Sequence, residues 1–215
     1  MKKRFWPGCV LLLALLAWGI RRPYARHWGG ITHEGLEYVL PLAHPAAGIA
    51  QVPFANMPVY IYPTPRTRIG EGRGAWVRKA LTLPLENGSY SHDLNGKPLD
   101  FRLYRSQIIS LPYAYGNGQA ALNFGTLFYG RHTQACVGVV QLLEMRRGKL
   151  LLMDQFTYNC MGGGRVTYHP RQRSLHIHSP HYAAGDRLCC PSLDDRAHFS
   201  LDGRRAHSGG IKLVQ

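Results

Sequence analysis

Acidic residues are scarce in this chain of 215 residues, because 12 Asp and Glu stand against 26 Lys and Arg. The formal net charge is +14 at pH 7, and 11 histidines add positive charge under mildly acidic conditions. A surface of this kind repels cationic and favours anionic neighbours. The partners expected from charge alone are anionic lipid, anionic envelope polysaccharide or an acidic protein.

Several motifs that carry chemistry are also missing. No RNP-like, zinc-finger or helix-turn-helix signature accompanies the basic residues, so no specific nucleic-acid binding is expected. A Gly-x-Ser-x-Gly nucleophile elbow and a Cys-x-x-Cys pair are absent, and the Gly-x-Gly-x-Gly run at 70–74 is not followed by Lys-Ser/Thr. We therefore favour a non-enzymatic protein with no catalytic residues and no cofactor.

Long helical periods are lacking as well, and 14 Pro and 24 Gly interrupt the chain. From residue 83 onward, short runs of β-forming residues alternate with turn pairs such as Asn87-Gly88 and Asn95-Gly96. The sequence predicts a mainly β fold, with α+β as the alternative, built as a single antiparallel sheet or a sandwich-like domain. Helix is expected only in short pieces, such as Gln119–Asn123.

Three strand pairs are expected within this region. The apolar run 135–145 and the run 149–156 are joined by a short polar link and predict a central hairpin. A turn at 169–173 separates the strands expected at 165–168 and 174–178, and the turn at 202–205 separates two last strands.

The predicted domain organisation has three parts. Residues 1–20 hold a basic start and an uncharged run of 16 residues, Phe5 to Ile20, which indicates a signal peptide or an N-terminal membrane anchor. Residues 21–82 form a Pro/Gly-rich arm that packs on the domain or spaces it from the membrane. Residues 83–215 form the β-rich exported domain, located in the periplasm or cell envelope and attached to the inner membrane if the leader is uncleaved.

Cysteine usage fits an oxidising compartment. Four cysteines of the exported part, Cys136, Cys160, Cys189 and Cys190, allow three pairings. We favour a bridge from Cys136 to Cys160, because both are expected on neighbouring segments of the central hairpin. Cys189 and Cys190 would then form a vicinal disulfide in front of Pro191, although two adjacent thiolates can also present themselves to a metal or to a redox partner.

Three histidines precede the adjacent cysteines in the segment His-Ile-His-Ser-Pro-His. His176 and His178 point to one face if the segment is a strand, and His181 follows on the next turn. With Cys189 and Cys190 nearby, this spacing suggests a site for copper or zinc. A periplasmic metal-binding or thiol-redox protein is therefore the alternative function.

The chain from 83 to 215 resembles a group of bacterial exported proteins, many of them lipoproteins, of the LppP/LprE type. The resemblance rests on a Leu-x-Asn-Gly-x-Tyr segment at 85–90, the apolar strand at 137–143, and a closing motif made of Asp186, Cys189, Cys190, Pro191 and Ser192. Relatives carry an acidic turn before the apolar strand, whereas this chain reads Phe-Tyr-Gly-Arg-His-Thr-Gln at 128–134, so no calcium-type loop is expected. The resemblance implies export and a β domain, and it assigns no activity. We expect a cell-envelope binding or structural module with a disulfide-stabilised β domain.

Overall fold

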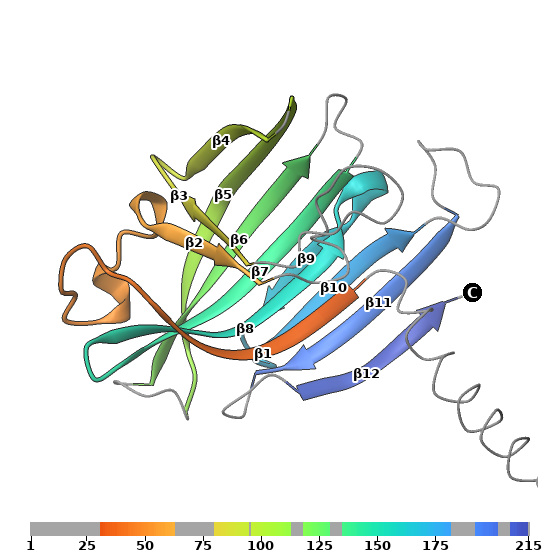
Figure 1. Cartoon of the computed structure of the whole chain (residues 1–215). Coiled ribbons are helices and arrows are strands. Elements are labelled where there is room, and N and C mark those ends of the chain that lie inside the picture. Colours follow the sequence, from red (N-terminus) through yellow and green to blue (C-terminus); the bar gives the residue numbers. More distant parts are fainter. Residues whose placement is uncertain are drawn as a thin grey trace, which may run out of the picture.

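The computed structural model describes residues 31–62, 80–94, 96–112, 118–129, 135–181, 192–201 and 207–214. The protein is mainly β and antiparallel, as predicted (Figure 1). Its largest sheet has six strands in the order β1-β8-β7-β6-β5-β4. Their bounds are β1 Ile31–Leu40, β4 Ser89–Leu94, β5 Lys97–Ser110, β6 Gln119–Tyr129, β7 Ala135–Arg146 and β8 Lys149–Asn159.

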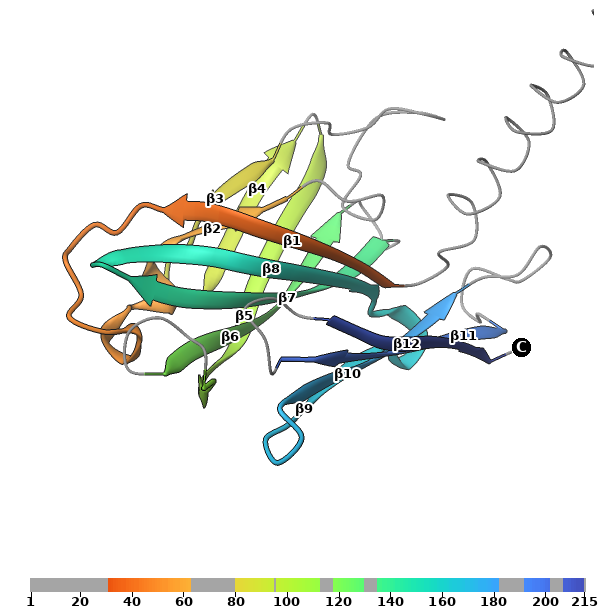
Figure 2. The same cartoon turned by 90° about the horizontal axis from the view of Figure 1, so that it is seen from below.

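A second sheet of four strands, in the order β12-β11-β10-β9, lies against one face of the first (Figure 2). Its strands are β9 Arg165–His169, β10 Ser174–His181, β11 Leu193–Ser200 and β12 His207–Val214. Leu175, Ile177 and Phe199 from this sheet pack with Leu122, Val140 and other side chains of the six-stranded sheet in one core cluster. The two sheets therefore form a sandwich, closed by apolar burial of the alternate residues on each strand.

The opposite face of the six-stranded sheet is covered by a small hairpin and two short turns of 3-10 helix. The hairpin pairs β2, Pro58–Ile61, with β3, Leu81–Pro84, and the 3-10 turns are η1, Ile49–Gln51, and η2, Phe54–Asn56. Two further core clusters form beneath them. A third turn, η3 at Met161–Gly163, follows β8. Within the described ranges no helix has the length and apolar composition needed to cross a bilayer.

Part of the predicted arm belongs to this fold. Strand β1 runs antiparallel to β8 as the edge strand of the main sheet, and Phe54 and Ile61 are buried in the core. Residues 31–62 and 81–82 of the segment 21–82 thus contribute strands, 3-10 turns and core side chains to the sandwich. The prolines described in this segment, Pro41, Pro45, Pro53 and Pro58, lie between the short elements or at the start of one, where no ladder hydrogen bond is lost.

The predicted hairpins are confirmed. Strands β7 and β8 pair from Val137 with Asn159 to Arg146 with Lys149, and β9 pairs with β10. Arg147 and Gly148 both have positive φ, 50° and 74°, as the tight turn between β7 and β8 requires. The short helix expected at Gln119–Asn123 is wrong, because these residues form the start of β6. Burial of Ala120, Ala121 and Leu122 between β5 and β7 outweighs the weak helical preference of this segment.

Buried amides cross the main sheet on the side of the small hairpin. Asn123, Gln141 and Gln155 occupy directly paired positions on β6, β7 and β8 and are 4%, 3% and 0% exposed. The Nε2 of Gln141 donates to the carbonyl of Tyr60 at 2.6 Å. Gln155 donates to the carbonyl of Tyr62 and accepts from its N–H, both at 3.0 Å. The side chains of Gln141 and Gln155 thus make hydrogen bonds of the kind that a neighbouring strand would make, and they attach the end of β2 to the sheet.

Candidate functional site

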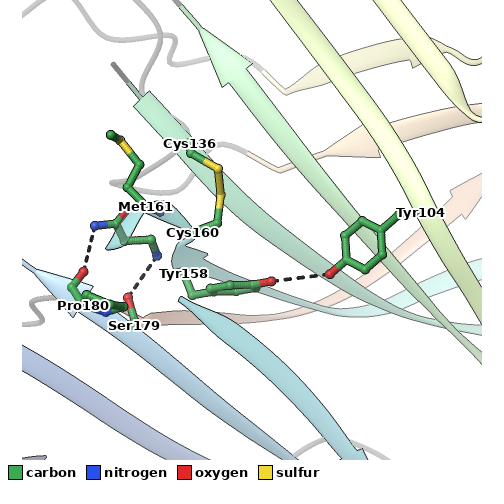
Figure 3. Close-up of a disulfide and its surroundings, with 8 residues drawn as sticks. Tyr104, Cys136, Tyr158, Cys160, Met161, Ser179 and Pro180 are labelled. Atoms are coloured by element: carbon green, nitrogen blue, oxygen red, sulfur yellow. Dashed lines mark hydrogen bonds between the residues drawn. A yellow bond between two sulfur atoms is a disulfide. The ribbon is translucent and has the colours of Figure 1, made fainter. Parts of the chain in front are cut away.

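The predicted bridge from Cys136 to Cys160 is confirmed (Figure 3). The two Cα atoms lie 5.3 Å apart, and the N–H of Cys160 also donates to the carbonyl of Cys136 at 3.3 Å. Cys136 lies near the start of β7 and Cys160 directly follows β8, so the bridge joins the two ends of the central hairpin. The disulfide-stabilised β domain expected from the sequence is therefore present.

The surroundings of this bridge connect the two sheets (Figure 3). Asn159 donates its backbone N–H to the Oγ of Ser179 at 2.9 Å and its Nδ2 to the carbonyl of Pro180 at 2.7 Å. Tyr158 lies 3.5 Å from Tyr104, hydroxyl to hydroxyl. Burial raises the pKa of Tyr158, and its hydrogen bond with Tyr104 raises it further. This end of the molecule is a structural junction between β8 and β10.

Most of the predicted cysteine motif lies outside the described residues. This applies to Asp186, Cys189, Cys190 and Pro191, and the vicinal disulfide stays a prediction. Ser192 is described, and it is exposed immediately before β11.

The predicted histidines belong to β10, on the outer side of the four-stranded sheet. Leu175 and Ile177 face the core, so His176 and His178 share the opposite face, as the strand period predicts. His181 ends β10 and pairs through its backbone with Leu193. A metal site shared by His176, His178 and His181 stays a prediction.

The structure gives His176 and His178 different surroundings. The Nε2 of His178 lies 2.5 Å from the Oδ1 of Asp194, an ion pair when the imidazole is protonated. His176 instead contacts two other histidines, with ring centroids 4.2 Å from His169 and 4.6 Å from His198. Partial loss of hydration lowers the pKa of His176, and His169 and His198 lower it further. The His176 ring is therefore neutral at pH 7.

His169 and His198 were not found as candidates from the sequence. His198 lies directly opposite His176 on β11, whereas His169 pairs with Ser174, two residues before His176. The signal for His169 is the register of the β9–β10 hairpin, because a turn of four residues places 169 opposite 174. The sequence contains no comparable signal for the pairing of β10 with β11, because 11 residues separate His181 from Leu193.

Arginines surround the histidines on this outer face. Arg165 and Arg196 are exposed and both lie opposite His178, one on each neighbouring strand. Arg171 and Arg173 are exposed in the adjoining turn. Among the residues described on β9, β10 and β11, Asp194 is the acidic side chain on this side, and it contacts the Nε of Arg196 at 3.3 Å. We call this surface, from Arg165, Arg171 and Arg173 to Arg196, the cationic face.

A histidine and an aspartate are in contact between the two sheets. His33 donates from Nε2 to the Oδ1 of Asp154 at 2.7 Å, and the ring of His33 stacks on that of Phe156, with centroids 4.7 Å apart and planes inclined by 9°. Asp154 is fully buried, and Phe199 contacts the same imidazole from the second sheet. The His33 side chain keeps 22% of its surface exposed, whereas its partner carboxylate is buried, which suits a structural role.

Comparison of the chain with protein-family models, with curated proteins and with solved structures gives no match.

Proposed function

We propose that the protein is an exported, non-enzymatic binding module of the cell envelope, and that the cationic face contacts an anionic membrane surface. The observation that carries the proposal is the pair Arg165 and Arg196, exposed on the outer face of one sheet on either side of His178, with Arg171 and Arg173 exposed in the adjoining turn. Side chains on one face of a sheet stand side by side on neighbouring strands, so an extended anionic partner can contact several of them at once. The segment 5–20 supports the same location, because it lacks charge over 16 residues.

The number of charges removed determines how much the affinity for anionic membranes should fall. Each Lys or Arg near an anionic bilayer contributes about 1 kcal/mol. Removal of the charges of Arg165 and Arg196 should therefore weaken attachment about thirtyfold, and charge reversal should weaken it further. The attraction should also decline as salt rises, because the Debye length shortens to about 8 Å at physiological ionic strength.

The test is co-sedimentation of the full chain with vesicles of neutral lipid and with vesicles that contain anionic phospholipid, across a salt series. The excess binding to anionic vesicles isolates the electrostatic contribution from insertion of the apolar segment 5–20. We expect Arg165→Glu with Arg196→Glu to remove most of that excess. The matched control is Arg102→Glu with Lys149→Glu, which makes the same charge change at exposed positions of the main sheet.

The proposal is wrong if both double variants lose the same excess, because net charge and not this face would then be responsible. It is also wrong if wild-type binding shows no difference between neutral and anionic vesicles at low salt.

A further inference from the structure

Three histidines form a continuous row across β9, β10 and β11. His176 has His169 on one side and His198 on the other, at the ring-centroid distances of 4.2 and 4.6 Å given above. His176 and His198 are a direct cross-strand pair, for which Cβ atoms lie about 4.5–5.5 Å apart. This separation allows two imidazoles to turn toward one ion between them.

One nitrogen in this row has no hydrogen-bond partner within the described parts of the chain. The Nε2 of His198 is buried, yet no donor or acceptor satisfies it. An unsatisfied buried polar atom destabilises the folded state, so a ligand at this nitrogen is favoured. His178 differs, since Asp194 already contacts its Nε2.

Imidazole nitrogen is a preferred ligand of borderline divalent ions such as Cu²⁺ and Zn²⁺. We propose that the cross-strand pair His176 and His198 forms a two-histidine site for a divalent transition metal ion on the outer face of the four-stranded sheet. This set differs from the one expected from sequence, because it takes its ligands from two neighbouring strands and not from one. The proposal does not depend on membrane attachment.

Metal binding at this site requires the rings to turn. As the side chains stand, no group of three or more His, Cys, Asp or Glu among the described residues is arranged to hold a metal ion. The rings of His169 and His176 meet at 45°, and those of His176 and His198 at 72°. His176 is exposed, so rotation about its side-chain bonds meets little resistance, and it can bring one nitrogen toward the free Nε2 of His198.

The test is titration of the tag-free full chain with Cu²⁺ by calorimetry, followed by electron paramagnetic resonance of the bound ion. We expect nitrogen hyperfine structure in the wild type, and an affinity at least a hundredfold lower in His176→Gln and in His198→Gln. His92→Gln is the control, because His92 is exposed on the main sheet. Since Cys189 and Cys190 would be competing metal ligands if they were reduced, the variant Cys189→Ser with Cys190→Ser is titrated in parallel.

Two results would overturn the inference. One is Cu²⁺ affinity in His176→Gln equal to that of the His92 variant. The other is loss of all binding in the serine double variant while both histidine variants keep it. If His198→Gln does not fold, His176→Gln still decides, because an exposed ring can be replaced without loss of core packing. Zn²⁺ alone should raise the melting temperature of the wild type and leave that of His176→Gln unchanged.

Discussion

Replacement of Gln155 by Glu should make the stability of the protein depend strongly on pH. Gln155 is fully buried and makes two hydrogen bonds with the backbone of Tyr62. A neutral glutamic acid can reproduce both, because its O–H donates to the carbonyl of Tyr62 and its other oxygen accepts from the N–H. A carboxylate retains the acceptor but faces that carbonyl with a second oxygen, and it carries an unpaired charge into the core.

The size of the effect follows from proton linkage. Burial raises the pKa of such a carboxyl group above its ordinary value of about 4.3 in the unfolded chain. The folded state then holds the proton more tightly, so stability is retained below pH 4 and is lost as pH rises toward the folded pKa. Each unit above 4.3 costs about 1.4 kcal/mol, and the loss at pH 7 should reach about 3–4 kcal/mol. Near pH 4 the variant should lie within about 1 kcal/mol of the wild type.

Urea unfolding followed by circular dichroism at several pH values between 4 and 7 measures this difference. Gln119→Glu is the matched control, because Gln119 is exposed at the start of β6 and the same substitution there should cost less than about 0.5 kcal/mol at every pH. The reasoning would be refuted if the Gln155 variant lost the same free energy at pH 4 and pH 7, or if it behaved like the control.

Three further changes test the packing around the sheet junction. Cys136→Ser with Cys160→Ser releases a loop with a sequence separation of 24, so chain entropy predicts a loss of about 3.4 kcal/mol, measurable by urea unfolding. Gly138→Ala would place a Cβ 2.1 Å from the ring of Tyr158 and should lower the unfolding free energy by about 1–3 kcal/mol, whereas addition of Tyr158→Leu should recover part of that loss. Because the pKa of Tyr158 is raised in the folded state, stability should fall as pH rises above about 10. Tyr158→Phe should remove that fall, and an unchanged alkaline transition would exclude Tyr158 as its cause.

Local pairings were predictable from the sequence, and distant ones were not. The hairpins at Arg147-Gly148 and at 169–173 follow from short polar links between β-forming runs, because the turn itself fixes the pairing. The bridge from Cys136 to Cys160 followed from that hairpin. In contrast, β1 pairs with β8, which is more than 100 residues away in the sequence. No local pattern in the proline-rich segment that contains β1 indicates which strand it pairs with.

In the candidate site, too, local features were predictable from the sequence and contacts between distant residues were not. The common face of His176 and His178 follows from the strand period alone. Their different surroundings depend on β11, which supplies His198 beside one and Asp194 beside the other. The pairing of β10 with β11 depends on the tertiary structure. The sequence therefore shows which positions are histidines, but it does not show which of their rings are in contact.

The two sheets are built from separate stretches of the chain, and this fixes the order in which they can be completed. Every strand of the six-stranded sheet lies between residues 31 and 159, whereas the four-stranded sheet begins at residue 165 and ends at 214. At synthesis rates of about 5–20 residues per second, the second sheet emerges about 3–10 s after the first is complete. During that interval Leu122, Val140 and Phe156 have no cover. A newly made chain therefore passes through a stage at which this apolar surface is exposed, and a chaperone can bind it during that interval.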